Sequence, residues 1–525
     1  MGQVGLQTDN NSCCIFSTIC IEQVCHLQTV KAMIIRSKTL AIMNLIYGYL
    51  PCIVFLFGWC RLLISIPTSV VLLVLMMLFV KQMDNDDSVK VEVPILILTL
   101  VLSSVFCLII GYGGVFANFY DYIKHSSIIQ DLVFYDWPVI YTQHEPAMLT
   151  YYLGQYVIPS LFGKVLHNRV AAELFMGVIG WIGVYLLYLN LMLLTKADNN
   201  RKQLLLLVLF FFFSGMLLPL QFIYNMLPLS GFRSYLNPHW FIVNEWLLQY
   251  RSTLVALRWA YPQFIVPCMG AAMLYWSKNY KYSAFLILPS FLFGTWGFLC
   301  LVVLILLRFA IVTIKNKKFN FDIVSTQNIV VVLIGCIFLF YYWGNIVSDK
   351  PDYMKLSIIT KPWYYIKVYL PFVLFMFGFY VFLVWQDFKT NSMFLSVVVI
   401  LLLIPCFKMG YYNDFVMCVS LPALFLLSSY LFRFLFAADS KQKSVKLRKV
   451  ILTICLLLAC TSPLMESKFI FPLKKMPFPQ RTLSTFTDRD GNLSDVSDIC
   501  IDCMRYNYYT YYPENTFFYN YISRK

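Results

Sequence analysis

Asp121 and His125 are the first two side chains in this sequence whose types and spacing could do chemistry. They lie in residues 117–133 (ANFYDYIKHSSIIQDLV), where apolar side chains recur at helical spacing. Residues four apart meet on one face of a helix, so a carboxylate and an imidazole would stand close enough to hydrogen-bond or share a cation. A partly desolvated carboxylate can act as a general base or a metal ligand. The structural alternative is an ordinary interfacial helix with solvated charges.

Further ionisable side chains gather in the same loop and in a second loop. His144 and Glu145 stand before a proline downstream of Asp121, while Arg251 and Arg258 lie within residues 221–262. Arginine presents paired donors that suit an anionic oxygen such as that of a phosphate. A pure scaffold has no need to collect such groups beside a membrane. Each arginine could instead anchor its loop at the level of the lipid headgroups.

The elements that must position these residues are membrane-spanning helices. Of the 525 residues, 60% are hydrophobic and 13% are charged, far from the balance of a soluble domain. Residues 204–220 (LLLLVLFFFFSGMLLPL) form an uncharged run of the length and composition of a bilayer-spanning helix. Similar runs recur along the chain and predict an all-α, polytopic transmembrane bundle of about 13 spans. The predicted spans are 39–60, 62–80, 94–111, 171–195, 204–220, 263–277, 282–292, 294–312, 329–345, 369–386, 391–407, 415–437 and 449–463.

Short loops rich in Lys and Arg set the predicted orientation. With residues 1–38 as a cytoplasmic extension, the basic loops 196–202, 278–281, 315–318 and 441–449 all fall on the cytoplasmic side. The formal net charge of +15 therefore reports orientation, and it does not indicate a nucleic-acid partner. One predicted outer loop, 346–368, does not fit this orientation, because it carries four lysines. The predicted transmembrane domain covers 39–463, with outer loops 111–150 and 221–262 and an outer tail 464–525.

Two features of the predicted outer tail concern its own structure. Cys500 and Cys503 would stand in an oxidising compartment, where either a disulfide or two free thiols is open. The Tyr-rich run 506–521 (YNYYTYYPENTFFYNY) is expected to fold back on the outer mouth of the bundle, because so many aromatic side chains gain from burial.

The order of these segments resembles that of the polytopic GT-C glycosyltransferases and, more closely, of a group of bacterial multi-spanning proteins related to them. The resemblance depends on four motifs. They are Asn118-x-x-Asp121-x-x-x-His125 with Asp131-Leu132 and Trp137-Pro138, Glu145-Pro146, Arg258-Trp259-x-x-Pro262-Gln263, and Asn413-Asp414-Phe415. Two features depart from the family: two extra spans precede the acidic loop, and Cys418 stands where relatives carry arginine.

The resemblance implies a GT-C-like bundle with interfacial helices in its first large outer loop and a site at the extracytoplasmic face of a bacterial inner (plasma) membrane. Asp121 would be the general base, or would hold a divalent Mg or Mn ion with His125. The implied partners are a polyprenyl-phosphate-linked sugar donor, a glycan or lipid-linked acceptor, and membrane lipid. The residues implied to contact substrate are His125, His144, Glu145, Arg251, Arg258, Gln263 and Asp414.

The sequence is also compatible with three other functions. A transporter or a lipid flippase would place ionisable residues in the middle of its spans and break helices at corresponding positions of two halves. A polysaccharide polymerase or ligase would share the lipid-linked substrate and the outer site, so sequence barely separates it from a transferase.

Overall fold

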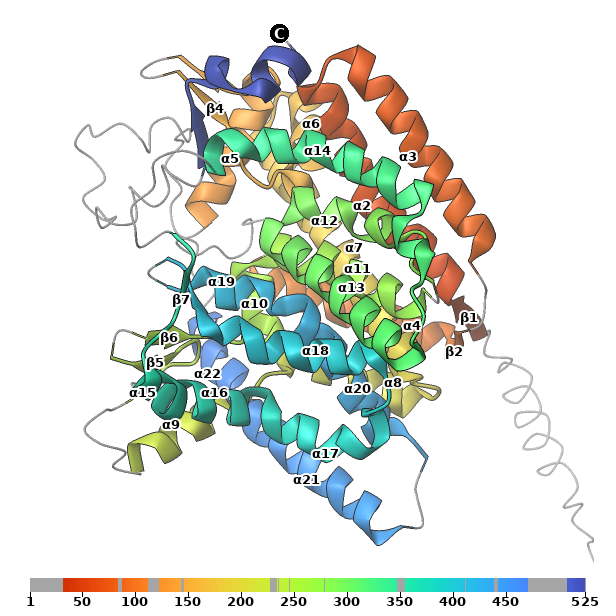
Figure 1. Cartoon of the computed structure of the whole chain (residues 1–525), viewed down its shortest axis with the longest axis vertical. Coiled ribbons are helices and arrows are strands. Elements are labelled where there is room, and N and C mark those ends of the chain that lie inside the picture. Colours follow the sequence, from red (N-terminus) through yellow and green to blue (C-terminus); the bar gives the residue numbers. More distant parts are fainter. Residues whose placement is uncertain are drawn as a thin grey trace, which may run out of the picture.

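The computed structural model consists mostly of helices stacked obliquely across one another (Figure 1). It describes residues 32–83, 87–111, 122–142, 146–226, 234, 236–244, 246–277, 279–346, 355–410, 412–438, 442–470 and 508–524, without the side chains of 122–124 and 467–470. The predicted tail cysteines Cys500 and Cys503 lie outside these residues.

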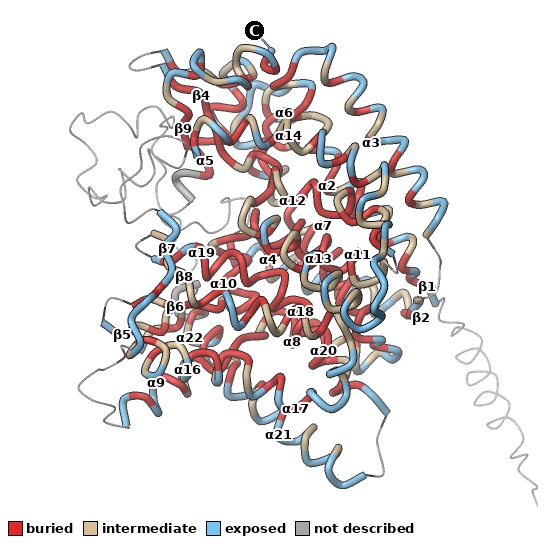
Figure 2. Tube along the Cα trace, in the orientation of Figure 1, coloured by how far each residue is buried: buried red, intermediate tan, exposed pale blue. Residues whose placement is uncertain are grey.

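Within these described residues, eight helical segments are long and apolar enough to cross a membrane. This is the pattern of a multi-pass membrane protein. The segments are Ser37–Trp59 (α2), Leu62–Gln82 (α3), Val93–Ile110 (α4), Arg169–Thr195 (α7), Thr295–Asn316 (α13), Thr326–Ile346 (α14), Pro362–Phe388 (α15 to α17) and Lys443–Glu466 (α21 and part of α22). Their outward surfaces are exposed while their inner faces are buried, as α3 and α21 show in Figure 2.

The remaining predicted spans also fall on helices, but these helices are short or bent. Asn200–Phe212 (α8) and Leu217–Met226 (α9) meet at an angle of 52° and would count as one further span. The shorter ones are Tyr261–Trp276 (α11), Ser283–Phe293 (α12), Ser392–Leu403 (α18) and Leu421–Phe436 (α20), which follows Asp414–Val419 (α19). Sequence therefore located the helices, and the count of about 13 complete crossings stays a prediction.

Gly294 ends α12 and allows α13 to begin against α11. A Cβ at Gly294 would lie 2.7 Å from Cγ and 2.8 Å from Cα of Gln263, closer than real side chains approach. Glycine is therefore required for this close approach of two helices. The break places the first turn of α13 beside the first turn of α11, where Gln263 lies.

The break between α8 and α9 has its backbone groups paired with other helices. Phe213 O accepts from Thr253 N at 3.1 Å, and Ser214 O accepts from Tyr380 Oη at 3.0 Å. Met216 N donates at 3.2 Å to Phe375 O, within a π turn of the 362–388 segment. A non-helical backbone at membrane depth is tolerated only with such partners.

The predicted cytoplasmic loops gather at one end of the bundle, which we call the basic end. Strand β1 (Ala32–Arg36) pairs there with β2 (Ser88–Glu92), at the right edge of Figure 1. Lys196 Nζ lies 3.5 Å from Asp87, and Arg448 Nη1 lies 2.6 Å from Asp387. This clustering supports the predicted connectivity of the spans, while the side of the membrane stays a prediction.

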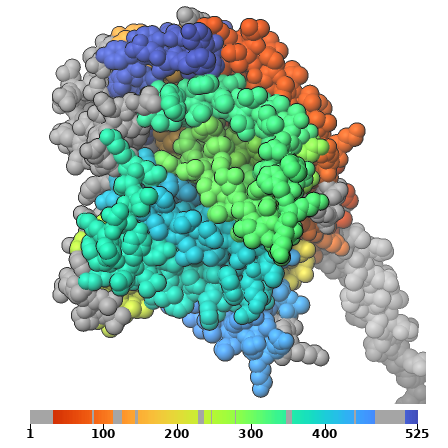
Figure 3. All heavy atoms as spheres, in the orientation of Figure 1, coloured from red at the N-terminus to blue at the C-terminus, as the bar shows by residue number. Residues whose placement is uncertain are grey.

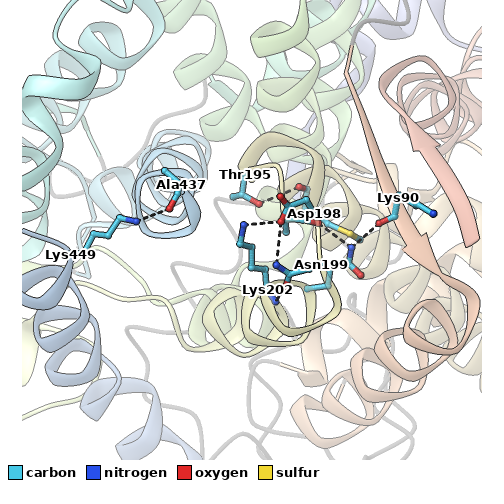
Figure 4. A network of polar contacts seen from close by, with 10 residues as sticks. Lys90, Thr195, Asp198, Asn199, Lys202, Ala437 and Lys449 are labelled. Carbon is cyan, nitrogen blue, oxygen red and sulfur yellow. Dashed lines mark hydrogen bonds and ion pairs between the residues drawn. The ribbon is translucent and has the colours of Figure 1, made fainter. Parts of the chain in front are cut away.

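Figure 4 shows how the loop between α7 and α8 is fixed at the basic end. The Asn199 side chain caps α8 by accepting from Lys202 N at 2.9 Å. Lys202 Nζ lies 2.7 Å from Asp198, and this hydrogen bond lowers the pKa of Asp198. Nearby, Lys449 Nζ donates to Ala437 O at 2.6 Å.

The opposite end carries three small antiparallel sheets, which makes the all-α expectation too simple. They are β5 (Phe241–Val243) with β6 (Trp246–Leu248), β7 (Ser357–Ile358) with β8 (Phe407–Lys408), and β3 (Ile140–Tyr141) with β4 (Ala147–Leu149) and β9 (Tyr509–Tyr511). Because β9 comes from the Tyr-rich run and pairs with β4 of the first large loop, the predicted folding-back of that run is confirmed.

The end of the chain lies against the α2–α3 hairpin, as the blue and orange-red surfaces in Figure 3 show. Arg61 Nη2 donates to Asn520 O at 2.6 Å, and Arg61 Nε donates to Ser523 O at 3.2 Å. Asn345 Nδ2 on α14 donates to Tyr509 O at 2.8 Å. The C-terminal segment thus connects the first hairpin, the first large loop and α14.

Candidate functional site

Helix α5 (Tyr122–Phe134) contains the described part of the first candidate motif. Its residues His125, Ser126 and Asp131 are buried, so the alternative of a helix with solvated polar side chains does not describe these three residues, while its position at the membrane surface stays a prediction. The polar side is covered because His125 Nδ1 hydrogen-bonds the Tyr156 hydroxyl on α6 (Gly154–Leu166), and Ser126 donates to Glu173 on α7. Helix α5 is consequently held as part of the core.

His125 lies between α6 and α11. Its ring centroid is 5.2 Å from that of Tyr261, in the first turn of α11, and Gln263 follows two residues later. The structure therefore places two of the predicted site residues, His125 and Gln263, at neighbouring helix ends. We call His125, Tyr156 and Tyr261 the His125 cluster.

Three of the predicted site residues lie outside the described part of the chain. Asp121 directly precedes α5 in sequence, four residues before His125, and His144 with Glu145 precedes β4. Their roles as base, metal ligand or substrate contact stay predictions.

Asp131 makes a buried contact that stabilises the fold. It is fully buried, and its Oδ2 accepts from the Tyr141 hydroxyl at 2.6 Å. Burial raises the pKa of Tyr141, and the Asp131 carboxylate raises it further, so the phenol stays protonated and donating at physiological pH.

Glu466 is the centre of a second group of ionisable side chains, which we call the Glu466 cluster. It lies on α22 (Thr461–Ile470) and is fully buried. Its Oε2 is 2.8 Å from His239 Nε2, and its Oε1 is 3.4 Å from both Arg258 Nη1 and Trp259 Nε1. A buried carboxylate destabilises the fold unless it has cationic and hydrogen-bonding partners of this kind.

Arg258 is therefore engaged by a carboxylate, which the sequence did not predict. It stands in the last turn of α10 (Thr253–Trp259), where burial lowers the pKa of its guanidinium and the Glu466 carboxylate opposes that shift. The Arg258 guanidinium also lies 5.5 Å from the Trp259 ring.

The short joint at Ala260 connects the two clusters. Helix α10 ends and α11 begins at this residue, so Arg258 and Trp259 reach Glu466 on one side while Tyr261 reaches His125 on the other. The motif Arg258-Trp259-x-x-Pro262-Gln263 is thus the corner shared by both groups.

The other two predicted contacts lie at the same end of the molecule. Arg251 is half-buried and directly precedes Ser252, whose hydroxyl caps α10 by accepting from Val255 N. Asp414 is exposed as the first residue of α19, and the neighbouring Phe415 ring packs on Trp296 in the first turn of α13.

Glu466 and His239 were missing from the predicted site. The sequence signal for Glu466 is a carboxylate directly after a long apolar run, because such a group is costly beside a membrane unless it has a function or partners. His239 has no comparable local signal, since its partners Glu466 and Trp259 are distant in the sequence.

The chemistry available at this end is proton transfer and the stabilisation of negative charge. Imidazole and carboxylate can exchange protons, while guanidinium can bind an anionic oxygen. Over the described ranges, no three His, Cys, Asp or Glu side chains come together as ligands for a metal ion. Because Asp121 lies outside those ranges, the Mg or Mn site stays a prediction.

Comparison of the chain with protein-family models, curated proteins and solved structures finds no match. The placement of its own side chains is therefore the basis for assigning a function.

Proposed function

We propose that this chain is an integral membrane glycosyltransferase that moves a sugar from a polyprenyl-phosphate-linked donor to a glycan or lipid-linked acceptor at the extracytoplasmic face. The observation that carries the proposal is the Glu466 cluster, buried beside the His125 cluster at the end of the bundle opposite the basic loops. Such a transfer needs a base for the acceptor hydroxyl and cations for the departing phosphate.

Arg258 and His239 are the groups that would meet the departing polyprenyl phosphate. The contact with Glu466 uses Nη1 of Arg258, and a guanidinium has five N–H donors in a fixed fork. One edge can stay on Glu466 while other donors meet phosphate oxygens. In this mechanism Glu466 orients Arg258 and His239 and takes no part in bond making.

Asp121 would be the base for the acceptor. It would take the proton of the acceptor hydroxyl, whose oxygen forms a bond to the anomeric carbon as the bond from that carbon to the phosphate oxygen breaks. The electron pair of the broken bond leaves with the polyprenyl phosphate. The burial of α5 supports this role, because Asp121 directly precedes in sequence a helix that other helices hold in place.

The position of charged residues favours transfer over transport. Across the described spans, charged side chains lie in or near the end turns, with Arg308 of α13 as the exception. Arg308 donates to Leu274 O at 2.7 Å and Ser277 O at 3.1 Å, so it closes the C-terminal end of α11 at the basic end. A transporter would place such groups along a path through the middle of its spans.

The test uses purified protein in lipid nanodiscs with a panel of radiolabelled polyprenyl-phosphate-linked hexoses and an extract of cell-envelope acceptors. The expected result is release of polyprenyl phosphate together with transfer of label to an acceptor. Parallel liposomes containing the protein would report movement of the same lipids or of solutes. Flux without consumption of any donor would contradict the proposal and favour a transporter or flippase.

A further inference from the structure

Two buried glutamines beside the His125 cluster carry polar atoms without a partner. Gln155 is 6% exposed, and neither its Oε1 nor its Nε2 has a hydrogen-bond partner among the described residues. Gln263 is 7% exposed, and its Oε1 also has no hydrogen-bond partner among the described residues. Buried side-chain amides are normally hydrogen-bonded, because an unpaired desolvated group destabilises the fold. Such amides point to a ligand.

The two glutamines stand in the first turns of α6 and α11, and residues of other helices connect these turns at two places. His125 bonds Tyr156, the residue after Gln155, and packs on Tyr261, two residues before Gln263. The break between α12 and α13 makes the second connection.

At that break, the helices are too close for ordinary side chains. A Cβ at Gly154 would overlap the Phe293 ring, and a Cβ at Gly294 would lie 2.7 Å from Gln263 Cγ. Phe293 and Gly294 thus connect the start of α6 to the starts of α11 and α13, and Gln155 and Gln263 lie in two of these first turns.

The unpartnered atoms restrict the chemistry of the ligand. A side-chain amide offers both a carbonyl acceptor and an NH2 donor group. An ionised carboxylate or a phosphodiester supplies no proton to Oε1 of Gln155 or Gln263, and an ammonium supplies no acceptor for Nε2 of Gln155. A hydroxyl group both donates and accepts, so neighbouring hydroxyls on one ring can satisfy all of these atoms. The amides carry no charge, so they do not offset the desolvation of a carboxylate or an ammonium on the same ring.

We infer that Gln155 and Gln263 form a subsite for an uncharged sugar ring and select it against uronic acids and amino sugars. The inference that this ring is the one transferred depends on the proposed function; the recognition of the ring does not. The subsite adds Gln155 to the predicted contacts and gives Gln263 a defined role in specificity.

The test compares Gln155→Met and Gln263→Met with a matched control, Gln203→Met. Methionine keeps the unbranched shape of glutamine and removes its polar atoms. Gln203 is also buried, and its Oε1 likewise has no partner among the described residues, but its Nε2 donates at 3.0 Å to both Lys90 O and Ala197 O at the basic end, away from the His125 cluster. Purified proteins would be heated with methyl glycosides of glucose, galactose or mannose, or with glucuronic acid or glucosamine.

At least one neutral methyl glycoside should raise the Tm of the parent and of Gln203→Met, while the charged sugars should not. The apparent Kd for that glycoside should rise about 10-fold or more in either subsite variant, because a site built for hydroxyls loses its partners. Without sugar, the subsite variants should melt at or above the Tm of the parent, whereas Gln203→Met should melt lower.

Two results would overturn the subsite: protection of the parent by charged sugars equal to that by neutral ones, or undiminished protection of both subsite variants. No protection of the parent by any neutral glycoside would also count against it. Because the readout is binding, it is separable from the proposed function. Transfer without glutamine-dependent protection rejects only the subsite, and glutamine-dependent protection without transfer rejects only the transferase.

Discussion

The Glu466 carboxylate and the His239 imidazole lie 2.8 Å apart, between Oε2 and Nε2, in a place where Glu466 has no exposed surface. His239 lies two residues before β5 of the short sheet β5–β6, and Glu466 comes from the helix that ends the last apolar run. The contact therefore fixes the second large loop against the end of the final span. Arg258 and Trp259 complete the surroundings of the carboxylate.

Glu466→Gln should weaken both the fold and the activity. Removing one partner from a buried charge group leaves the others uncompensated, so the free energy of unfolding should fall by about 3 kcal/mol. Sugar transfer should also fall, because Arg258 and His239 lose the group that orients them. Unfolding would be followed in detergent with increasing denaturant.

The matched control for this substitution is Glu514→Gln at the same end of the molecule. Glu514 is exposed, so its unfolding free energy should stay within about 0.5 kcal/mol of the parent. If Glu466→Gln unfolds like the parent and transfers sugar at the parental rate, the Glu466 cluster has neither role.

Asp131→Asn should lower the free energy of unfolding and leave sugar transfer unchanged. The substitution weakens the buried bond from Tyr141, and the expected loss is about 2 kcal/mol of unfolding free energy. Because the pKa of Tyr141 is raised, the bond persists at physiological pH and the loss should be the same at pH 6 and pH 8. Transfer per folded molecule should stay parental. A double-mutant cycle with Tyr141→Phe measures the coupling, and additive effects would show that the bond contributes nothing.

Arg61→Ala should loosen the end of the chain. The side chain donates to Asn520 O and Ser523 O, and its loss should increase local opening of the C-terminal segment about fivefold. Carboxypeptidase release of a C-terminal tag would report the opening rate. Lys81→Ala, an exposed change at the other end of α3, is the control. Equal release from both variants would mean that Arg61 does not hold the segment.

Sequence could place the helices because apolar runs determine them locally. The predicted spans 62–80 and 171–195 correspond closely to Leu62–Gln82 and Arg169–Thr195. The number of crossings was not determined, because α12 is as apolar as a lipid-facing helix although its neighbours are other helices. Apolar composition alone does not distinguish lipid from protein surroundings.

Sequence identified the residues of the candidate site whose signal is local and did not identify those that depend on tertiary contacts. His125, Arg258 and Gln263 were found through motifs, and they do lie at neighbouring helix ends. The burial of α5 was not foreseen, because its polar face is covered by Tyr156 and Glu173 from later helices. Glu466 is recognised as part of a cluster only through its contacts with His239 and Arg258, and no spacing in the sequence connects these residues to it.

The most direct test of the account is the rate of sugar transfer by Asp121→Asn from a polyprenyl-phosphate donor. Asparagine keeps the size of the side chain and removes the charge that a general base uses, so transfer should fall by about 100-fold or more with unfolding free energy within about 1 kcal/mol of the parent. Asp136→Asn, an exposed carboxylate just after α5, is the matched control and should keep parental activity. Parental transfer by Asp121→Asn would contradict the proposed mechanism.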